Sequence, residues 1–191
     1  MQYYQEITLL PDAETSRSFL WTKVFTQLHI AFADWKNRHG AMDFAVSFPE
    51  YGAETLGSKI RLMAETEEAL TAFDAGRVLA RLSDYVHLTR VRPIPARRVR
   101  GWATYSRWQE EGALPSRARR YARRHADVSY EKALRLLDKG KPKTVPPYVW
   151  MKSFTSGQVF RLFIKKDEVQ EDGRGAIGTY GLSHGYAVPE F

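Results

Sequence analysis

The spacing of apolar residues in the first half of the chain predicts alternating strands and helices. Residues 3–10 alternate apolar and polar side chains and end before Pro11, which predicts a strand. From about Ser16 to Lys36, apolar residues recur every three or four positions, which predicts a helix with one apolar stripe. The stripe consists of Leu20, Val24, Leu28, Ala31, Phe32 and Trp35.

The next segments continue this alternation. Residues 44–48 and 59–63 are strand-like, Thr66 is a candidate N-cap for a helix through Phe73, and residues 86–91 form a last strand. The resulting order βαββαβ is the ferredoxin-like arrangement, which RNA-recognition modules share. Because this fold serves many unrelated functions, it predicts an α+β class and no particular activity.

The second half of the chain contains a segment rich in arginine. Residues 114–125 predict a helix, with Pro115 suited to its first position. On a helix, the five arginines fall within about 160° of arc, opposite Ala118 and Tyr121. These arginines are Arg117, Arg119, Arg120, Arg123 and Arg124.

More elements are expected after the arginine segment. Ser129 is a candidate N-cap for a second helix that stops at Gly140, and residues 139–143 form a basic turn. Residues 148–154 and 159–165 predict a hairpin. The remaining tail is rich in glycine, and we expect it to be a loop that lies against an RNA backbone.

Charge is distributed unevenly over the 191 residues, whose formal net charge is +7. Residues 1–95 carry 10 Lys and Arg against 12 Asp and Glu, a net of −2, and residues 96–191 carry +9. Pro93 and Pro95 lie at the boundary between these two halves of the chain. We therefore expect a ferredoxin-like domain over residues 1–95 and a basic α+β domain with an arginine-rich helix over residues 96–191.

Composition excludes several classes of protein. With no cysteine, the chain has no disulfide, thiolate zinc site, iron–sulfur cluster or cysteine nucleophile. It shows no signal peptide and no apolar run of about 18 residues, so we expect a soluble, cytoplasmic protein. The five histidines form no ligand pair, and the acidic pairs Glu67–Glu68 and Glu110–Glu111 lack a D-x-D pattern. No metal site and no cofactor are therefore predicted.

The arginine face indicates a polyanionic partner. It has no acidic partners, so its like charges repel unless phosphates neutralise them. A solvated basic helix and a general binder of double-stranded DNA are the alternatives. The segment 173–178 matches G-x-G-x-x-G, but no amphipathic helix follows it, so a dinucleotide site is not predicted.

His29 is the best candidate for acid–base chemistry. It lies at the margin of the apolar stripe of the first helix, where a side chain can face a cleft. Metal-free cleavage is available for RNA because its own 2′-hydroxyl can act as the nucleophile. From spacing alone, a boundary histidine with local hydrogen bonds is the favoured explanation of His29, because most such histidines are structural, and Ser153 and Tyr180 are ordinary residues.

Six collinear segments resemble one known family. The chain is similar, over its whole length, to the precursor-RNA endoribonuclease of type I-F CRISPR systems, the Csy-type branch of the Cas-six family. The matching segments are residues 27–29 (QLH), 46–49 (VSFP), 106–109 (SRWQ), 119–125 (RRYARRH), 156–164 (SGQVFRLFI) and 180–183 (YGLS).

The resemblance implies how RNA would be bound. In the family, an arginine-rich helix lies in the major groove of a repeat hairpin, which needs an accessible groove end. Arginine and an amide near the foot of the stem read bases, and an aromatic residue stacks on the terminal base pair. Arg120, Arg123 and Arg124 match the arginines that enter the groove, and Arg119 lies on the same face. Arg107 and Gln109 match the residues that read bases, and Phe160 matches the aromatic residue that stacks.

The resemblance also implies a reaction. His29 matches the family's general base, Ser153 the serine that orients the attacking ribose, and Tyr180 a tyrosine that supports the histidine. The expected reaction is metal-independent cleavage at the 3′ base of the hairpin, which leaves a 2′,3′-cyclic phosphate and a 5′-hydroxyl. The enzyme would stay bound to the mature crRNA with other subunits of a type I-F surveillance complex. The alternative is a non-catalytic hairpin-binding subunit.

The chain departs from the family pattern at several positions near the expected RNA. These departures bear on the hairpin sequence and on how the linker meets the stem. They are Trp102, Trp108, Glu110, Glu111 and Phe154.

Overall fold

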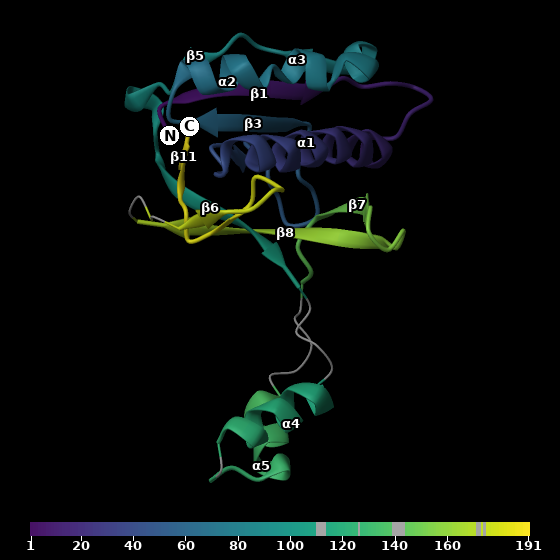
Figure 1. Cartoon of the computed structure of the whole chain (residues 1–191), viewed down its shortest axis with the longest axis vertical. Helices are drawn as coiled ribbons and strands as arrows, with labels where there is room; N and C mark the ends of the chain where they lie inside the picture. The colour runs from purple at the N-terminus through teal and green to yellow at the C-terminus, as the bar shows by residue number, and fades with distance from the viewer. Residues whose placement is uncertain (110–113, 126, 139–143, 171–172, 174) are drawn as a thin grey trace. The chain divides into compact units, whose positions relative to one another are not determined.

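Residues 1–109, 114–125, 127–138, 144–170, 173 and 175–191 are described by the structure, a computed structural model (Figure 1). They group into two compact units, which are taken one at a time below. The first unit comprises Met1–Arg107 and Pro146–Phe191, and the second Trp108–Val145. These compact units have other bounds than the two domains expected over residues 1–95 and 96–191. The expected domains divide the chain by function, and that division stays a prediction.

The first sheet of the first unit is antiparallel and has the order β2-β3-β1-β4. A short fifth strand, β5, pairs with β1. The predicted strands are confirmed, although the last one ends three residues early. The bounds are β1 Tyr3–Leu9, β2 Ala45–Ser47, β3 Lys59–Ala64, β4 Val86–Leu88 and β5 Arg92–Pro93.

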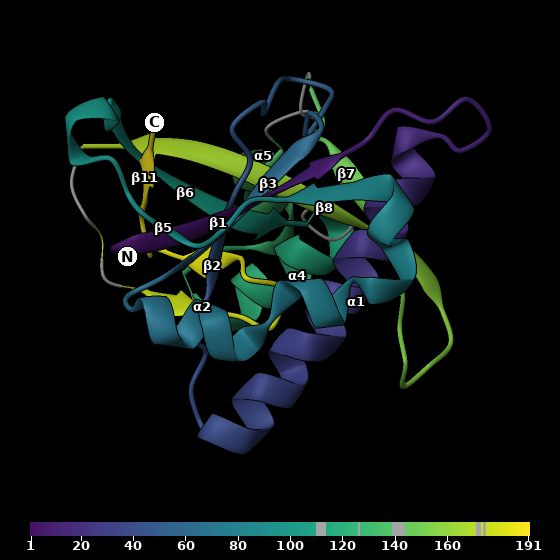
Figure 2. The ribbon, with the colours of Figure 1, turned by 90° about the horizontal axis from the view of Figure 1, so that it is seen from above.

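The helices that connect these strands begin after side-chain caps, of which Thr66 was predicted as a cap and Ser16 only as the approximate helix start. Ser16 and Thr66 each accept a backbone N–H three residues ahead, at 3.3 and 3.2 Å. Figure 2 shows α1 and α2 on the same side of β1 and β3. The bounds are α1 Arg17–His39, α2 Glu67–Phe73, α3 Ala75–Val78 and two 3₁₀ helices, η1 Ala80–Tyr85 and η2 Ala96–Arg98.

A second antiparallel sheet has the order β11-β6-β8-β7. The predicted hairpin is present, with β7 ending at Lys152 and β8 continuing to Val169. The glycine-rich tail is not the loop expected, because its backbone pairs into three short strands. The bounds are β6 Gly101–Trp108, β7 Tyr148–Lys152, β8 Val159–Val169, β9 Ala176–Ile177, β10 Ser183–His184 and β11 Val188–Glu190.

Helix α1 runs between the two sheets (Figure 1) and supplies the centre of the core. Its buried residues include Leu28, which is 1% exposed, and the core continues into Val149 and Leu162 of the second sheet. On the sheet side, the Oγ1 of Thr26 lies 3.9 Å from the Sδ of Met151. One helix therefore buries apolar surface against both sheets.

Tyr105 on β6 links the second sheet to the first. Its hydroxyl lies 3.2 Å from the carbonyl oxygen of Phe48, directly after β2, and 3.0 Å from Oε1 of Glu190. Lys166 contacts the other carboxylate oxygen of Glu190 at 2.5 Å. Burial, followed by the nearby Glu190 charge, raises the pKa of Tyr105 well above its usual range, so this phenol stays neutral.

The described residues of the second unit form two helices, α4 Leu114–Arg124 and α5 Tyr130–Leu137. They pack through Ala118 and Ala133, both fully buried. Ser129 caps α5 by accepting the N–H of Lys132 at 3.2 Å. The predicted stop at Gly140 and the basic turn at 139–143 lie outside the described residues.

Truncation of Leu28 to alanine tests the central position of α1. We expect Leu28→Ala to lower the free energy of unfolding by about 2–5 kcal/mol, because the side chain is enclosed and its removal leaves a cavity. The control is Ile30→Ala on the same helix, where the side chain is 42% exposed and the loss should stay below about 1 kcal/mol. Urea denaturation measures both; equal losses would contradict this packing.

Candidate functional site

His29 is held by a residue that lies far along the chain. Its side chain is half-buried on α1, and Nδ1 lies 2.8 Å from the carbonyl oxygen of Thr179. Because a carbonyl only accepts, Nδ1 must carry the proton in this contact. In the neutral imidazole, Nε2 then carries the lone pair and can accept a proton.

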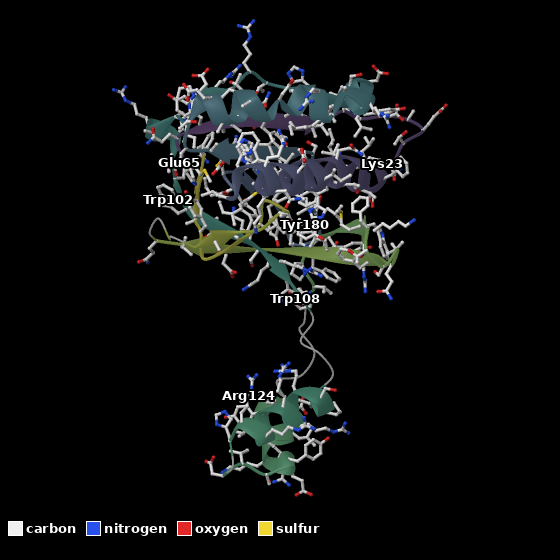
Figure 3. The ribbon with its side chains drawn as sticks, in the orientation of Figure 1. Lys23, Glu65, Trp102, Trp108, Arg124 and Tyr180 are labelled. Carbon is white, nitrogen blue, oxygen red and sulfur yellow. The ribbon has the colours of Figure 1, made fainter. Side chains whose placement is uncertain are left out.

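Tyr180 stacks on the His29 ring, with ring centroids 4.0 Å apart and planes 14° apart. The turn that carries Tyr180 is fixed to the first sheet, since the carbonyl of Gly181 accepts the N–H of Val46 at 3.0 Å. Figure 3 labels Tyr180 just below α1. His29 and Tyr180, which are about 150 positions apart in the sequence, are thus brought face to face. The sequence related these two residues only through the family resemblance.

A second histidine on α1 has the same kind of surroundings. His39 places Nδ1 3.0 Å from the carbonyl of Trp35 and stacks on the Trp35 ring at 3.9 Å. Its partner, however, is four residues away on the same helix, so this arrangement is local. What distinguishes His29 is that its carbonyl and its aromatic partner both come from another part of the fold.

Ser153 lies in the turn after β7 and uses its hydroxyl oxygen locally. Oγ accepts the N–H of Ser156 at 3.2 Å, and the Ser153 backbone bonds Gly157 and Gln158. The hydroxyl proton is still available to donate. Ser153 therefore lies in a tight turn, and in the described part of the chain its hydrogen bonds are to residues of that turn and not to His29.

Phe154, next to Ser153, is the residue of this turn that reaches the His29 side of α1. It is 68% exposed and lines a depression of about 320 Å³ together with His29 and Ile30. Asp34 and Asn37 form the polar part of that depression. Sequence reasoning noted Phe154 only as a departure from the family pattern, and Thr179 was missed because a backbone carbonyl has no sequence signature.

Two of the expected base-contacting residues lie together. The guanidinium carbon of Arg107, at the end of β6, is 5.4 Å from the ring centroid of Phe160 on β8. Trp108 ends the same strand, and Trp102 lines a depression of about 670 Å³ with Lys166 and other residues. Glu110 and Glu111 lie outside the described residues.

The arginines of α4 separate by exposure, whereas the helical wheel placed all five of them on one face. Ala118 is buried and Arg117 is half-buried. Among the described residues, no ion pair involves the four exposed arginines. These are Arg119, Arg120, Arg123 and Arg124, and Figure 3 labels Arg124. Their charge is left for a ligand to neutralise.

The described residues lack two further features. No cluster of three or more histidine, aspartate or glutamate side chains is arranged to hold a metal ion. Within the same residues, no helix combines the length and apolar character needed to cross a membrane.

The fold and the site define a mixed α+β protein that has a stacked histidine–tyrosine pair and a basic helical unit. Residues 4–191 match the family model described as CRISPR-associated protein (Cas_Csy4). The chain belongs to this family, which confirms the resemblance found in the sequence.

Two relatives match along their entire length. One is the CRISPR-associated endonuclease Cas6/Csy4 of Escherichia coli (strain UTI89 / UPEC), 33% identical over 193 residues, with 100% of both chains covered. The other carries the same name in Pseudomonas aeruginosa (strain UCBPP-PA14) and is 32% identical over 203 residues, again with 100% of both chains covered.

Substitution of Gly181 tests how the Tyr180 turn is held. Gly181 has φ +70°, and a Cβ there would lie 2.6 Å from Val46 Cγ1 and 3.1 Å from Phe32 Cε2, two buried side chains. Gly181→Ala should therefore lower the free energy of unfolding. The clash should contribute about 1–3 kcal/mol beyond the cost of placing alanine at a positive φ. It should also shift the His29 imidazole signals in NMR spectra, because Tyr180 moves.

Gly40→Ala is the matched control for this prediction. Gly40 has φ +78°, but a Cβ there would meet no described atom within 4 Å. The substitution Gly40→Ala therefore adds backbone strain of about 1–2 kcal/mol without a clash. If the two variants unfold at the same temperature and leave the His29 signals unchanged, the turn does not depend on this close approach.

Proposed function

We propose that this protein is a metal-independent endoribonuclease that cleaves CRISPR repeat RNA at the 3′ base of its hairpin. The observation that carries the proposal is the His29 arrangement, with Nδ1 fixed on the Thr179 carbonyl and the ring stacked on Tyr180. The family, whose relatives are named endonucleases, supports it. A histidine with one nitrogen fixed and the other able to accept a proton suits a general base.

The proposed reaction is a transesterification that balances without a cofactor. Nε2 of His29 takes the proton of the ribose 2′-hydroxyl, and the 2′-oxygen attacks the adjacent phosphorus. The bond between phosphorus and the 5′-oxygen breaks, and that oxygen takes up a proton. The products are a 2′,3′-cyclic phosphate on the retained hairpin and a 5′-hydroxyl on the released strand.

Tyr180 and Ser153 have positioning roles in this proposal. Stacking by Tyr180 limits rotation of the His29 ring, so Nε2 keeps one direction. Ser153 keeps a hydroxyl proton to donate to the ribose, and its turn adjoins Phe154, which lines the His29 depression. Both effects act on orientation, so both residues should matter less than His29.

Hairpin binding is assigned to the basic residues. We propose that α4 enters the major groove of the stem through Arg119, Arg120, Arg123 and Arg124, which are exposed and form no ion pair among the described residues. Arg107 and Gln109 would read bases at the foot of the stem, and Phe160 would stack on its terminal pair. The contact of Arg107 with Phe160 supports a common location for these last functions.

The domain assignment follows the strand order. The order β2-β3-β1-β4, with α1 after β1 and α2 after β3, supports a ferredoxin-like N-terminal domain over residues 1–95. Residues 96–191 would then be the RNA-hairpin-binding domain with its arginine-rich helix. Because cleavage leaves the stem intact, the protein would stay bound to mature crRNA and work in the cytoplasm with other type I-F subunits.

Removal of His29 tests the proposed base. In EDTA, we expect the wild-type protein to cut the repeat hairpin, and His29→Ala to reduce the single-turnover rate about 10²–10⁴-fold. A single 2′-deoxy substitution at the scissile nucleotide should abolish cleavage. His39→Ala, the local counterpart on α1, is the control and should cut at the wild-type rate.

The result also separates the enzyme from the non-catalytic alternative. A hairpin that is bound tightly but never cut would identify a binding subunit. Cleavage by His29→Ala at the wild-type rate would contradict the mechanism.

Neutralising the α4 arginines tests the groove contact. Changing Arg120, Arg123 and Arg124 to Gln should weaken hairpin binding and lower the slope of log Kd against log salt by up to about two to three, because fewer counterions are released. The control makes the same charge change at three exposed arginines of the first unit, Arg77, Arg81 and Arg90. Fluorescence anisotropy measures the slope, and equal effects of both triple variants would exclude a specific contact.

A further inference from the structure

The hairpin of β7 and β8 has a face on the side opposite α1. Val149, Met151 and Leu162 point toward the core, and Met151 meets Thr26 of α1. Because side chains alternate along a strand, the residues between them point the other way. This outer face consists of Tyr148, Trp150 and Lys152 of β7 and Val159, Arg161, Phe163 and Lys165 of β8.

Aromatic rings on the outer face are exposed to solvent. Tyr148 and Trp150 are each 41% exposed and meet edge to face, at 5.6 Å and 87°. Phe163 meets Tyr148 edge to face at 5.3 Å. An edge-to-face contact does not cover both rings as stacking would, so the 41% exposed Trp150 keeps accessible aromatic surface.

Cations lie among these rings. The guanidinium carbon of Arg161 is 5.4 Å from the Tyr148 centroid and 5.0 Å from that of Phe163. Lys152 is exposed at the end of β7, and Lys165 pairs with Asp167 at 2.6 Å. Among the described residues, Arg161 and Lys152 thus take part in no ion pair, and the local charge is positive.

This combination fits one class of ligand. Exposed aromatic rings stack unpaired bases, and interleaved cations attract the backbone phosphates. Protein interfaces are also rich in aromatic residues and arginine, but they are depleted in lysine, and this face carries Lys152 and Lys165. The combination was not expected from the sequence, because tyrosine and tryptophan at alternate strand positions are equally typical of a packed sheet.

We propose that the outer face binds the unpaired RNA that adjoins the repeat hairpin. The identity of the RNA rests on the proposed function. Trp150 lies three residues before Ser153, about 10 Å along the strand. A strand that leaves the foot of a hairpin held near Ser153 therefore needs only a few nucleotides to reach Trp150. The face would hold flanking RNA separately from the site at His29.

The test compares hairpins with and without unpaired flanks. The hairpin carries a 2′-deoxy scissile nucleotide, so it is not cut, and is used alone or with about eight uridines at its 5′ or 3′ end. Fluorescence anisotropy gives Kd for the full-length protein. We expect at least one flank to tighten binding about fivefold or more, and Trp150→Ala to remove that gain without changing Kd for the hairpin alone.

Two variants serve as controls. Trp150→Phe keeps an aromatic ring and should retain most of the gain. Phe19→Ala removes another exposed aromatic that carries a cation, since Lys23 Nζ lies 4.9 Å from the Phe19 centroid and the ring is 52% exposed. It should leave the gain unchanged. Unaltered binding of the hairpin alone shows that each variant is folded.

The outcomes separate this inference from the proposed function. If neither flank tightens binding, or if Tyr148→Ala combined with Trp150→Ala keeps the gain, the inference is wrong, and a protein-docking face remains the other explanation. If the wild-type protein does not bind the hairpin, the proposed function fails instead. Titration with the free uridine strand then still tests the face, because loss of its binding in Trp150→Ala supports the inference and equal binding overturns it.

Discussion

Burial of α1 between two antiparallel sheets is the packing constraint on which the first unit depends. Leu28 and its neighbours fill the core, while Thr26 faces Met151 of the second sheet. A helix enclosed on two sides has little freedom to rotate, because rotation would expose apolar surface to water. His29, directly after Leu28, therefore has its direction set by the core and not by its own contacts alone.

The site combines this fixed helix with a turn from the end of the chain. The left-handed conformation of Gly181 and its contact with Val46 bring Thr179 and Tyr180 to His29. The comparison with His39 shows why distance along the chain matters. A histidine held by its own helix needs no tertiary structure, whereas one held by a distant turn is positioned only once the protein has folded.

The sequence predicted α1, the cap at Thr66 and several of the strands, because local pattern and burial agree there. It missed α3 and η1, whose short turns have no apolar repeat, and it interpreted the tail as a loop although β11 pairs with β6. Helix pattern made His29 a candidate, and only the family resemblance connected it with Tyr180. The Thr179 carbonyl and the placement of Phe154 required coordinates, since both depend on contacts between distant segments.

The second unit has a very small interior. Among its described residues, the buried ones are Ala118 and Ala133, and its helices have 11 and 8 residues. Helices of this length are marginal on their own, and a methyl group contributes little burial. A polyanion bound to α4 would therefore add to the unit's folding free energy by mass action. In that sense the ligand acts as a structural component of the unit, and the order of α4 and α5 should rise with its concentration.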